Sequence, residues 1–299
     1  MQELPRIKER ISFIYLEYCN INRSESGISA SNSKGIVDIP IASICTLILG
    51  PGTTITHRAV ELIGEVGSTI IWAGEKGIRY YAHGRPLSHS SKMLETQAKL
   101  ASNARTRLNV ARKMYQMRFP GEDVSKMNMQ QLRGKEGSRI RSIYRSLSKE
   151  TGVDWNGRNY DPENYQDSDH INRALSSSNA CLYGAIHCAI VAMGCSPGLG
   201  FIHTGHERSF VYDIADLYKT EISIPTSFKI VASSPKDLDR AIRKATREEI
   251  VSKHILNRAV DDICTLLSET EESDPTIDNV SLWDTSGQYP SGRSYGDWS

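Results

Sequence analysis

The sequence has no paired-cysteine motif, no long apolar run and no phosphate-cradling glycine loop, and each absence excludes a class of protein. Its six cysteines form no CxxC pair, so a zinc ribbon or a thioredoxin-type redox site is not expected. The longest apolar run, 185–194, is interrupted by His187 and falls well short of the roughly 20 residues that a membrane helix needs. Without a P-loop or GxGxxG motif, dependence on ATP has no support.

The N-terminal stretch MQELPRIKER runs into ISFIYLEYCN with no small-residue cleavage site. We therefore expect no signal peptide, no membrane association and a cytoplasmic protein. The chain has 299 residues, of which 39% are hydrophobic and 24% charged, as in ordinary globular proteins. Cys181, Cys188 and Cys195 recur every seven residues, and we interpret them as small apolar side chains on one helix face.

Charge is strongly segregated along the chain, although the net charge is only +1. Twelve Lys or Arg residues and only three acids lie between Lys99 and Arg145, whereas 268–299 carries seven acids and one arginine. A basic body with an acidic tail is typical of a protein that binds a polyanion. The alternative is a solvated helix face with no such partner.

The pattern of elements predicts an α+β fold, with a small N-terminal β-rich domain followed by a larger all-α catalytic domain. Residues 1–85 alternate β-branched and aromatic runs with turn signals, and one short helix lies in HRAVELIGEVG. Residues 86–92 read as a linker, 93–268 as the helical domain, and 269–299 as a flexible, disordered acidic tail.

Helical periodicity after the linker predicts one helix that runs from about Leu94 to Phe119. Further helices are expected over 128–149, 169–192, 209–219 and 235–268. For the last of these, Ser234 is the expected cap and Pro235 the first helical residue. A polar, aromatic and turn-rich segment, WNGRNYDPENY, separates the second and third of these five helices.

Glu136 and three residues of a later segment are candidates for chemistry. Glu136 is the only acid in RGKEGSRIRSIYR, where it has Arg133 and Arg139 one turn away and would otherwise be a solvated partner of those arginines. His203, in GLGFIHTGHERSF, is expected to be semi-buried, and a structural role is its alternative. Asp213 and Asp216, in FVYDIADLYK, share one helix face by their spacing, and the alternative is two surface acids.

Taken together, these residues change the interpretation. Two carboxylates and an imidazole from three separate segments can form one divalent-metal site, and mixed oxygen and nitrogen ligands suit Mg²⁺ or Mn²⁺. A metal site among arginines is what phosphodiester chemistry needs, because metal and arginines together stabilise and orient the phosphate.

The runs QLRGKEGSRIRSIY, WNGRNYDPENY, CLYGAIHCAIVAMGCSPGLGFIHTG and SFVYDIADLYK closely resemble CRISPR-associated protein one, the integrase subunit of spacer acquisition, and most closely its type I-E branch. The resemblance extends from about Leu4 to about Leu267. It implies a homodimer, two copies of which flank a dimer of CRISPR-associated protein two in a heterohexamer. It also implies that the substrates are double-stranded protospacer DNA with single-stranded 3′ ends and CRISPR repeat DNA.

The same resemblance assigns roles to residues. It implies that Glu136, His203 and Asp216 are the metal-binding and catalytic residues, with Asp213 in support. It implies DNA contacts for a further set, which comprises Tyr18, Arg79, Tyr160, Tyr165, Lys219, Arg240 and Arg243. Tyr18 is expected to stack on the end of the protospacer duplex, and a buried strand tyrosine is the alternative.

The predicted function is therefore metal-dependent integration of DNA by phosphodiester transesterification. Two alternatives stay open. A metal-dependent endonuclease would use the same three ligands with water as the nucleophile. A non-catalytic structural DNA-binding protein would use its acids only to pair with arginines, and would need no metal.

Overall fold

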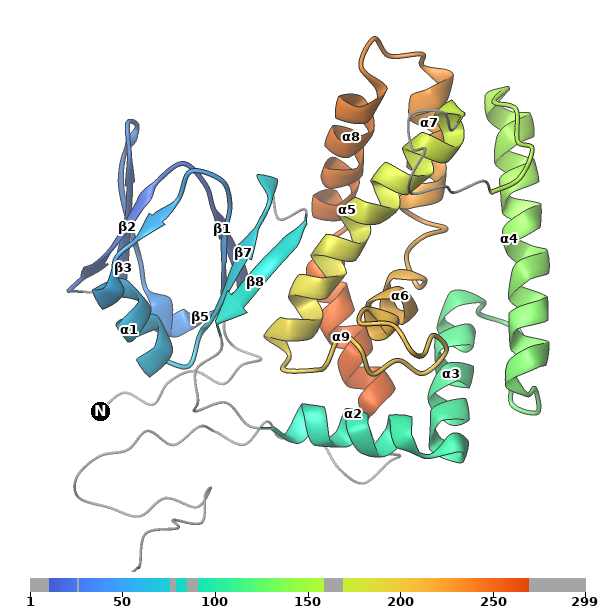
Figure 1. The fold of residues 1–299 in the computed structure, drawn as a ribbon, viewed down its shortest axis with the longest axis horizontal. Helices are drawn as coiled ribbons and strands as arrows, with labels where there is room; N and C mark the ends of the chain where they lie inside the picture. The colour runs from blue at the N-terminus through green and yellow to red at the C-terminus, as the bar shows by residue number, and fades with distance from the viewer. Residues whose placement is uncertain (1–10, 26, 76–78, 85–90, 159–168, 269–299) are drawn as a thin grey trace, which may run out of the picture.

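The structure, a computed structural model, describes residues 11–25, 27–75, 79–84, 91–158 and 169–268. The N-terminal part is built of strands around one helix and the remainder of helices, which confirms the predicted α+β class (Figure 1). The change from strands to helices falls between Gly84 and Lys92. The predicted acidic tail, 269–299, lies outside the described residues.

Two four-stranded sheets form the N-terminal part, with strand orders β1-β5-β7-β8 and β4-β3-β2-β6. In chain order the elements are β1 (Ile11–Leu16), β2 (Asn20–Ser24), β3 (Gly27–Asn32), β4 (Gly35–Ile39), the 3-10 helix η2 (Ile41–Ser43), β5 (Ile44–Leu49), β6 (Thr54–Ile55), α1 (His57–Glu65), β7 (Thr69–Ala73) and β8 (Tyr80–Gly84). The run ISFIYLEYCNI is thus two strands, β1 and β2, because the chain turns at Tyr18, where φ is 50°.

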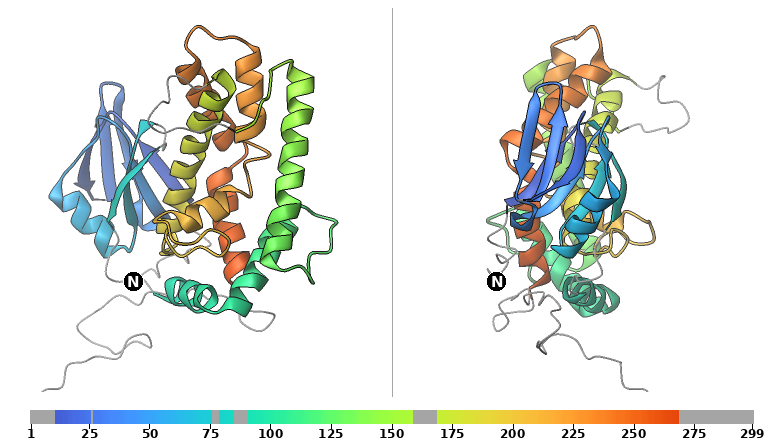
Figure 2. Two further views of the ribbon diagram at one scale, coloured as in Figure 1. Left: turned by 45° about the vertical axis from the view of Figure 1, so that its right-hand side comes forward. Right: turned by 90° about the vertical axis from the view of Figure 1, so that its left-hand side faces the viewer.

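Strands β1, β5 and β7 pair in parallel, and β5 and β7 are buried on both faces, which explains their nearly continuous apolar sequences. Leu47 and Leu49 face the core that the two sheets share with α1. Ile48, between them, faces the other way and packs with Cys188 and Val191 of the helical part. The sheet is therefore joined to the helices by a continuous apolar contact, and Figure 2 shows both sheets on one side of the helical part.

The helical part is organised around α5, whose sides contact α6, α7, α8 and α9. Its elements are α2 (Lys92–Ser102), α3 (Ala104–Arg118), α4 (Met129–Thr151), α5 (His170–Ala192), α6 (Ser209–Ala215), α7 (Ser223–Ala232), α8 (Leu238–Ser252) and α9 (Ile255–Leu267). Among the described residues, α5 alone is long and apolar enough to cross a membrane by length and composition. However, 67% of its apolar window is buried inside the protein, as in a core helix.

Two predicted helices are each interrupted. The helix expected from Leu94 to Phe119 is α2 and α3, because the side chain of Asn103 accepts hydrogen bonds from the backbone N–H groups of Arg105 and Thr106 and starts a new helix. The helix expected over 235–268 is α8 and α9, which are separated at His254, where φ is 51°. The predicted cap at Ser234 was wrong, since Asp237 caps α8.

Helix α7 was missed because SIPTSFKIVA is rich in β-branched residues and contains a proline. Pro225 lies in the first turn, where its missing N–H removes no helical hydrogen bond. Helix α6 ends at Ala215, earlier than the predicted Lys219. The three spaced cysteines are buried as predicted, but only Cys181 and Cys188 lie on α5, where they enter different apolar clusters.

Candidate active site

A cleft of about 1170 Å³ lies where β8, α3, α4, α5 and α6 come together. Its basic side chains, among the described residues, are Arg79, Arg118, Arg158, Arg208 and Lys219, and its acidic ones are Glu136, Glu207 and Asp216. The excess of positive charge makes this cleft suited to a phosphate-bearing ligand.

Glu136 projects from α4 toward α3 and is largely buried, with 19% of its side chain exposed. Its Oε2 accepts a hydrogen bond of 2.6 Å from the hydroxyl of Tyr115, and its Oε1 lies 2.5 Å from Nη2 of Arg118. Tyr115 and Arg118 lie three residues apart on α3, so one face of that helix holds both partners. Burial and the hydrogen bond to Glu136 raise the pKa of Tyr115, which keeps the phenol protonated.

The alternative of a solvated Glu136 that pairs with Arg133 and Arg139 is wrong. Arg133 donates a hydrogen bond of 2.6 Å to the backbone carbonyl of Ile202, and Arg139 pairs with Glu122. Arg133 therefore ties α4 to the segment that carries His203. The arginine that neutralises Glu136 comes from α3, a different helix.

Asp216 follows the last residue of α6 and is 8% exposed, which contradicts the alternative of a surface acid. Its Oδ1 lies 2.6 Å from Nζ of Lys219, and its Oδ2 lies 4.0 Å from Nη1 of Arg118. Burial alone would raise the pKa of Asp216, but Lys219 and Arg118 outweigh it and hold that pKa below its ordinary value. Asp216 is therefore an anion in a largely buried position.

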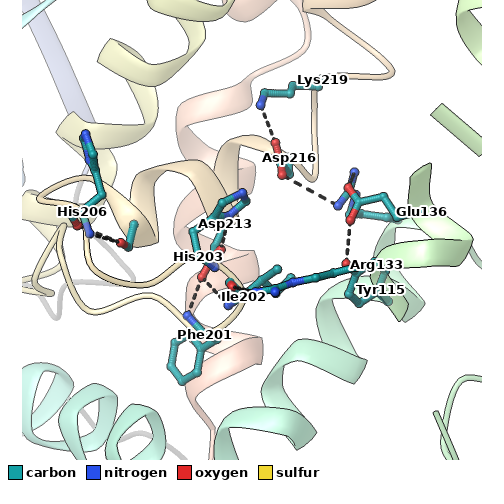
Figure 3. A network of polar contacts seen from close by, with 12 residues as sticks. Tyr115, Arg133, Glu136, Phe201, Ile202, His203, His206, Asp213, Asp216 and Lys219 are labelled. Atoms are coloured by element: carbon teal, nitrogen blue, oxygen red, sulfur yellow. Dashed lines mark hydrogen bonds and ion pairs between the residues drawn. The ribbon is translucent and has the colours of Figure 1, made fainter. Parts of the chain in front are cut away.

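Asp213 is fully buried and organises the segment around His203 (Figure 3). Its carboxylate accepts hydrogen bonds from the backbone N–H groups of Phe201, Ile202 and His203, and its Oδ1 lies 2.7 Å from Nδ1 of His203. The hydrogen bond to Asp213 raises the pKa of His203 against the opposing effect of burial. The His203 ring is thus fixed through Nδ1, so Nε2 is the ring nitrogen whose lone pair can bind a metal.

His203 is half-exposed, as expected, and His206 is exposed. Figure 3 shows His203, Asp216 and Glu136 around one region of the protein. As the side chains stand, however, no group of three or more His, Cys, Asp or Glu residues in the described part of the chain has a metal-binding arrangement. Arg118 contacts both Glu136 and Asp216, so the guanidinium lies between the two carboxylates. The side-chain atoms of Glu136, His203 and Asp216 are of the types that bind a divalent cation, but in this structure they do not converge on one point.

The predicted DNA-contacting residues fall into four groups. Arg79 and Lys219 line the cleft. Tyr18 is 64% exposed between β1 and β2, so its ring is accessible and the alternative of a buried strand tyrosine is wrong. Arg240 and Arg243 lie on α8 and are not among the residues that line the cleft. Tyr160 and Tyr165 lie outside the described residues.

Sequence reasoning missed Arg118 and the aromatic residues of the cleft. Nζ of Lys219 lies 5.0 Å from the centroid of the Tyr183 ring, and the Tyr183 and Tyr212 rings meet edge to face at 5.0 Å. Spacings of three and four residues place two pairs each on one helix face, Tyr115 with Arg118 and Tyr183 with His187. That spacing was a usable signal, but it did not reveal which faces meet across the fold.

The family model for CRISPR associated protein Cas1 matches residues 13–123 and 121–237 of this chain. CRISPR-associated endonuclease Cas1 of Clostridium sp. (strain SY8519) is 52% identical over 283 residues, which cover 94% of each chain. The Cas1 endonuclease of Escherichia coli (strain K12) is 40% identical over 90% of this chain and 88% of its own length.

The crystal structure of the TtCas1–DNA complex is 42% identical, with a TM-score of 0.82 over 88% of this chain and 99% of that chain. A casposase bound to integration product shares the fold, with a TM-score of 0.63 at 14% identity over 88% of this chain and 98% of that chain. The fold, the arrangement of the cleft and these similarities lead to one assignment: the chain belongs to the Cas1 family of CRISPR-associated proteins.

Proposed function

We propose that this chain is a metal-dependent DNA integrase of CRISPR adaptation. The 3′-hydroxyl of a captured DNA fragment attacks a backbone phosphate at the edge of a CRISPR repeat. The observation that carries the proposal is the cleft, in which Glu136 and Asp216 lie among five basic side chains. Carboxylates that can hold a cation, beside cations that can hold a DNA backbone, are the groups that phosphodiester exchange requires.

The proposed cofactor is Mg²⁺ or Mn²⁺, held by Glu136, His203 and Asp216. Two carboxylates and one imidazole fit these ions, and the imidazole favours Mn²⁺. When bound, such an ion offsets the negative charge that develops on the phosphate and on the leaving oxygen. The fixed orientation of the His203 ring supports the assignment, because a metal-binding histidine donates a hydrogen bond from the N–H of its other ring nitrogen to a carboxylate or carbonyl partner.

The chain contributes positioning and charge, and no protein nucleophile takes part. One P–O bond forms to the attacking 3′-oxygen, one breaks to the leaving 3′-oxygen, and the proton of the attacking hydroxyl ends on the leaving oxygen. Lys219 lies beside Asp216, which raises its pKa despite burial, so its ammonium stays charged toward the phosphate. Asp213 fixes His203, and Arg79 at the rim of the cleft holds the DNA backbone.

The second candidate function is a metal-dependent DNA endonuclease, in which water replaces the 3′-hydroxyl. It is favoured by the names of the curated relatives, which are CRISPR-associated endonucleases. A purely structural DNA-binding protein is the third outcome that an experiment must separate.

We further propose that the protein acts in the cytoplasm as a homodimer, two of which bind a dimer of CRISPR-associated protein two. The proposed substrates are protospacer DNA with single-stranded 3′ ends and CRISPR repeat DNA. The DNA-bound structure of TtCas1 supports the DNA part of this assignment. In the proposed complex Tyr18 and Arg79 contact the DNA from exposed positions, and Lys219 contacts it from inside the cleft. Arg240 and Arg243 form a separate basic site on α8.

The experiment combines the protein and its proposed partner with a labelled duplex that has single-stranded 3′ ends, a repeat-bearing plasmid and Mn²⁺. Joined product indicates an integrase, nicking alone an endonuclease, and retention without chemistry a scaffold. A matched fragment that ends in a 3′-dideoxynucleotide abolishes joining if the 3′-hydroxyl is the nucleophile, but leaves nicking by water unchanged.

Glu136→Gln and Asp216→Asn are each expected to lower joining about 100-fold or more, since even outer partners of metal sites contribute about 10–100-fold. DNA binding should persist because most of its affinity comes from the basic side chains. Glu122→Gln is the matched control, since Glu122 pairs with Lys135 and Arg139 and shares no partner with Glu136 or Asp216. Normal joining by Asp216→Asn would contradict the assignment.

A further inference from the structure

The guanidinium of Arg118 occupies an unusual place between two acids that the proposed function assigns to a metal. It contacts Glu136 through Nη2 at 2.5 Å and Asp216 through Nη1 at 4.0 Å. The side chain is only 4% exposed, yet it lines the cleft. The rings of Tyr115 and Phe119 lie 5.8 and 5.4 Å from its terminal carbon and hold it in position.

Arg118 has hydrogen-bonding capacity that its surroundings do not use. Its Nε and Nη1 atoms are buried and have no hydrogen-bond partner among the described residues. A guanidinium presents a planar set of N–H donors that matches the oxygens of a phosphate. A buried arginine with unpaired donors at a basic cleft is therefore well suited to receive a phosphate oxygen.

The same two carboxylates cannot be fully shared by a divalent cation and by Arg118. A cation bound to both must displace positive charge that now lies between them, and that charge then needs another anion. We propose that Arg118 couples metal binding to DNA binding. Without DNA its guanidinium pairs with Glu136 and Asp216. When DNA binds, the guanidinium pairs with a phosphate instead, and the two carboxylates become available to bind the metal. The inference rests on the proposed metal site and adds a regulating residue to it.

This coupling has a thermodynamic consequence. If DNA raises the affinity for metal by releasing the carboxylates, metal must raise the affinity for DNA by the same factor. The protein would then assemble its active site only on DNA, which protects other DNA from a metal-loaded enzyme. In this scheme Arg118 binds the DNA phosphate directly and acts on the metal only indirectly, by holding or releasing the two carboxylates.

The test measures Mn²⁺ affinity of the full-length chain from the electron paramagnetic resonance signal of free Mn²⁺, with and without a duplex that lacks 3′-hydroxyl ends. In the wild type, DNA should tighten Mn²⁺ binding about 5–150-fold, the usual range of coupling between sites. Arg118→Met should bind Mn²⁺ more tightly than the wild type without DNA, by about the same factor, and should gain little further when DNA is added.

Arg139→Met is the matched control. Arg139 also lies over the Phe119 ring, 4.0 Å from its centroid, but it pairs with Glu122 rather than with Glu136 or Asp216. It should keep the wild-type metal affinity and the wild-type response to DNA. Arg118→Lys, which keeps the charge but cannot span both carboxylates, should give an intermediate affinity and serves if Arg118→Met does not fold.

Two contrary results are distinguishable. If Glu136→Gln removes Mn²⁺ binding but both Arg118 variants bind Mn²⁺ like the wild type, with the same response to DNA, the coupling is overturned and the metal site stands. If Glu136→Gln leaves Mn²⁺ binding unchanged, the proposed metal site is wrong and the inference fails with it.

Discussion

Gly200 shows how a single residue controls the shape of the candidate site. A Cβ at this position would collide with the backbone carbonyl of His203, and it would lie 2.8 Å from Cβ of Ser209 and 2.9 Å from Oδ2 of Asp213. The missing side chain allows the GLGFIHTG segment to fold closely around the Asp213 carboxylate. Because that carboxylate holds His203, Gly200 positions the imidazole without touching any substrate.

Gly200→Ala is therefore expected to destabilise the protein by about 1–3 kcal/mol, the usual cost of forcing atoms into a packed site. Urea denaturation measures the change. Gly198→Ala is the matched control, because the nearest atom to an added Cβ there is the Glu207 carbonyl oxygen at 3.5 Å, an ordinary contact. Equal stability of the two variants would show that the segment adapts freely and that Gly200 does not constrain it.

At this scale the sequence indicated some site residues and concealed others. The spacing of Asp213 and Asp216 indicated only a shared helix face, and burial of both side chains contradicts the alternative of two surface acids. The partner of Glu136 could not be found from spacing, because the nearest arginines along α4 turn away to Ile202 and Glu122. Arg118 reaches Glu136 only through the packing of α3 on α4, a contact that no local pattern encodes.

Among the elements, α4 depends most on its ends and on one aromatic cluster. Its side chain Leu132 is buried, but most of the helix is partly exposed. Asn128 and Gln131 form a capping box at its start, and Gly152, with φ of 71°, ends it. Tyr144 stacks on Trp155 at 4.2 Å between ring centroids, and both rings meet Phe228 of α7.

Trp155→Ala is expected to lower the free energy of unfolding by about 0.5–1.5 kcal/mol, because the aromatic pair is lost. The loss of the apolar contacts of this half-exposed ring lowers it further. Amide hydrogen exchange should then increase in the C-terminal half of α4, around Tyr144. Trp155→Phe retains a stacked ring and should keep most of the protection. Unchanged exchange in Trp155→Ala would mean that the caps alone hold the helix.

Periodicity predicted the existence of most helices but not their breaks. Asn103 and His254 interrupt apolar patterns that continue on either side, and a cap or a positive φ is decided by one residue. Helix α7 forms despite the low helix propensity of its residues, because Ile224 and Phe228 are buried against α5 and α4. Tertiary packing therefore outweighs a weak local preference. The parallel order of β1, β5 and β7 likewise needed contacts between strands far apart in sequence.

The whole molecule is joined at the seam between the first sheet and α5. Beside the apolar contact of Ile48 and Ile71 with α5, the ring of His187 stacks on Tyr80 of β8 with centroids 3.8 Å apart. His187 and Tyr80 also line the cleft, so the seam and the candidate site share residues. The cleft could not be predicted from the sequence because it forms only when both parts of the molecule dock.

This seam should make stability depend on pH. Burial, and to a lesser extent the positive charges of Arg208 and His83, lower the pKa of His187 to about 4 from an ordinary value of 6.5. Above pH 6.5 the residue is neutral in both the folded and the unfolded chain, so its contribution is constant. As the pH falls from 6.5 to 4, the unfolded chain binds a proton that the folded chain does not, and the free energy of unfolding decreases.

His187→Phe keeps a ring on Tyr80 but cannot titrate, so the variant should lose less stability than the wild type between pH 6.5 and pH 4. Urea denaturation at pH 7, 5.5 and 4.5 measures the difference, and solvent screens part of it because the ring is only half-buried. His170→Phe replaces an exposed histidine at the start of α5 and should follow the wild-type profile. If His187→Phe also follows that profile, the seam histidine is protonated as easily in the folded chain as in the unfolded one. Any loss of stability between pH 6.5 and pH 4 would then have a source other than Asp216, because the lowered pKa of Asp216 costs stability only when the pH falls below its ordinary value of 3.8.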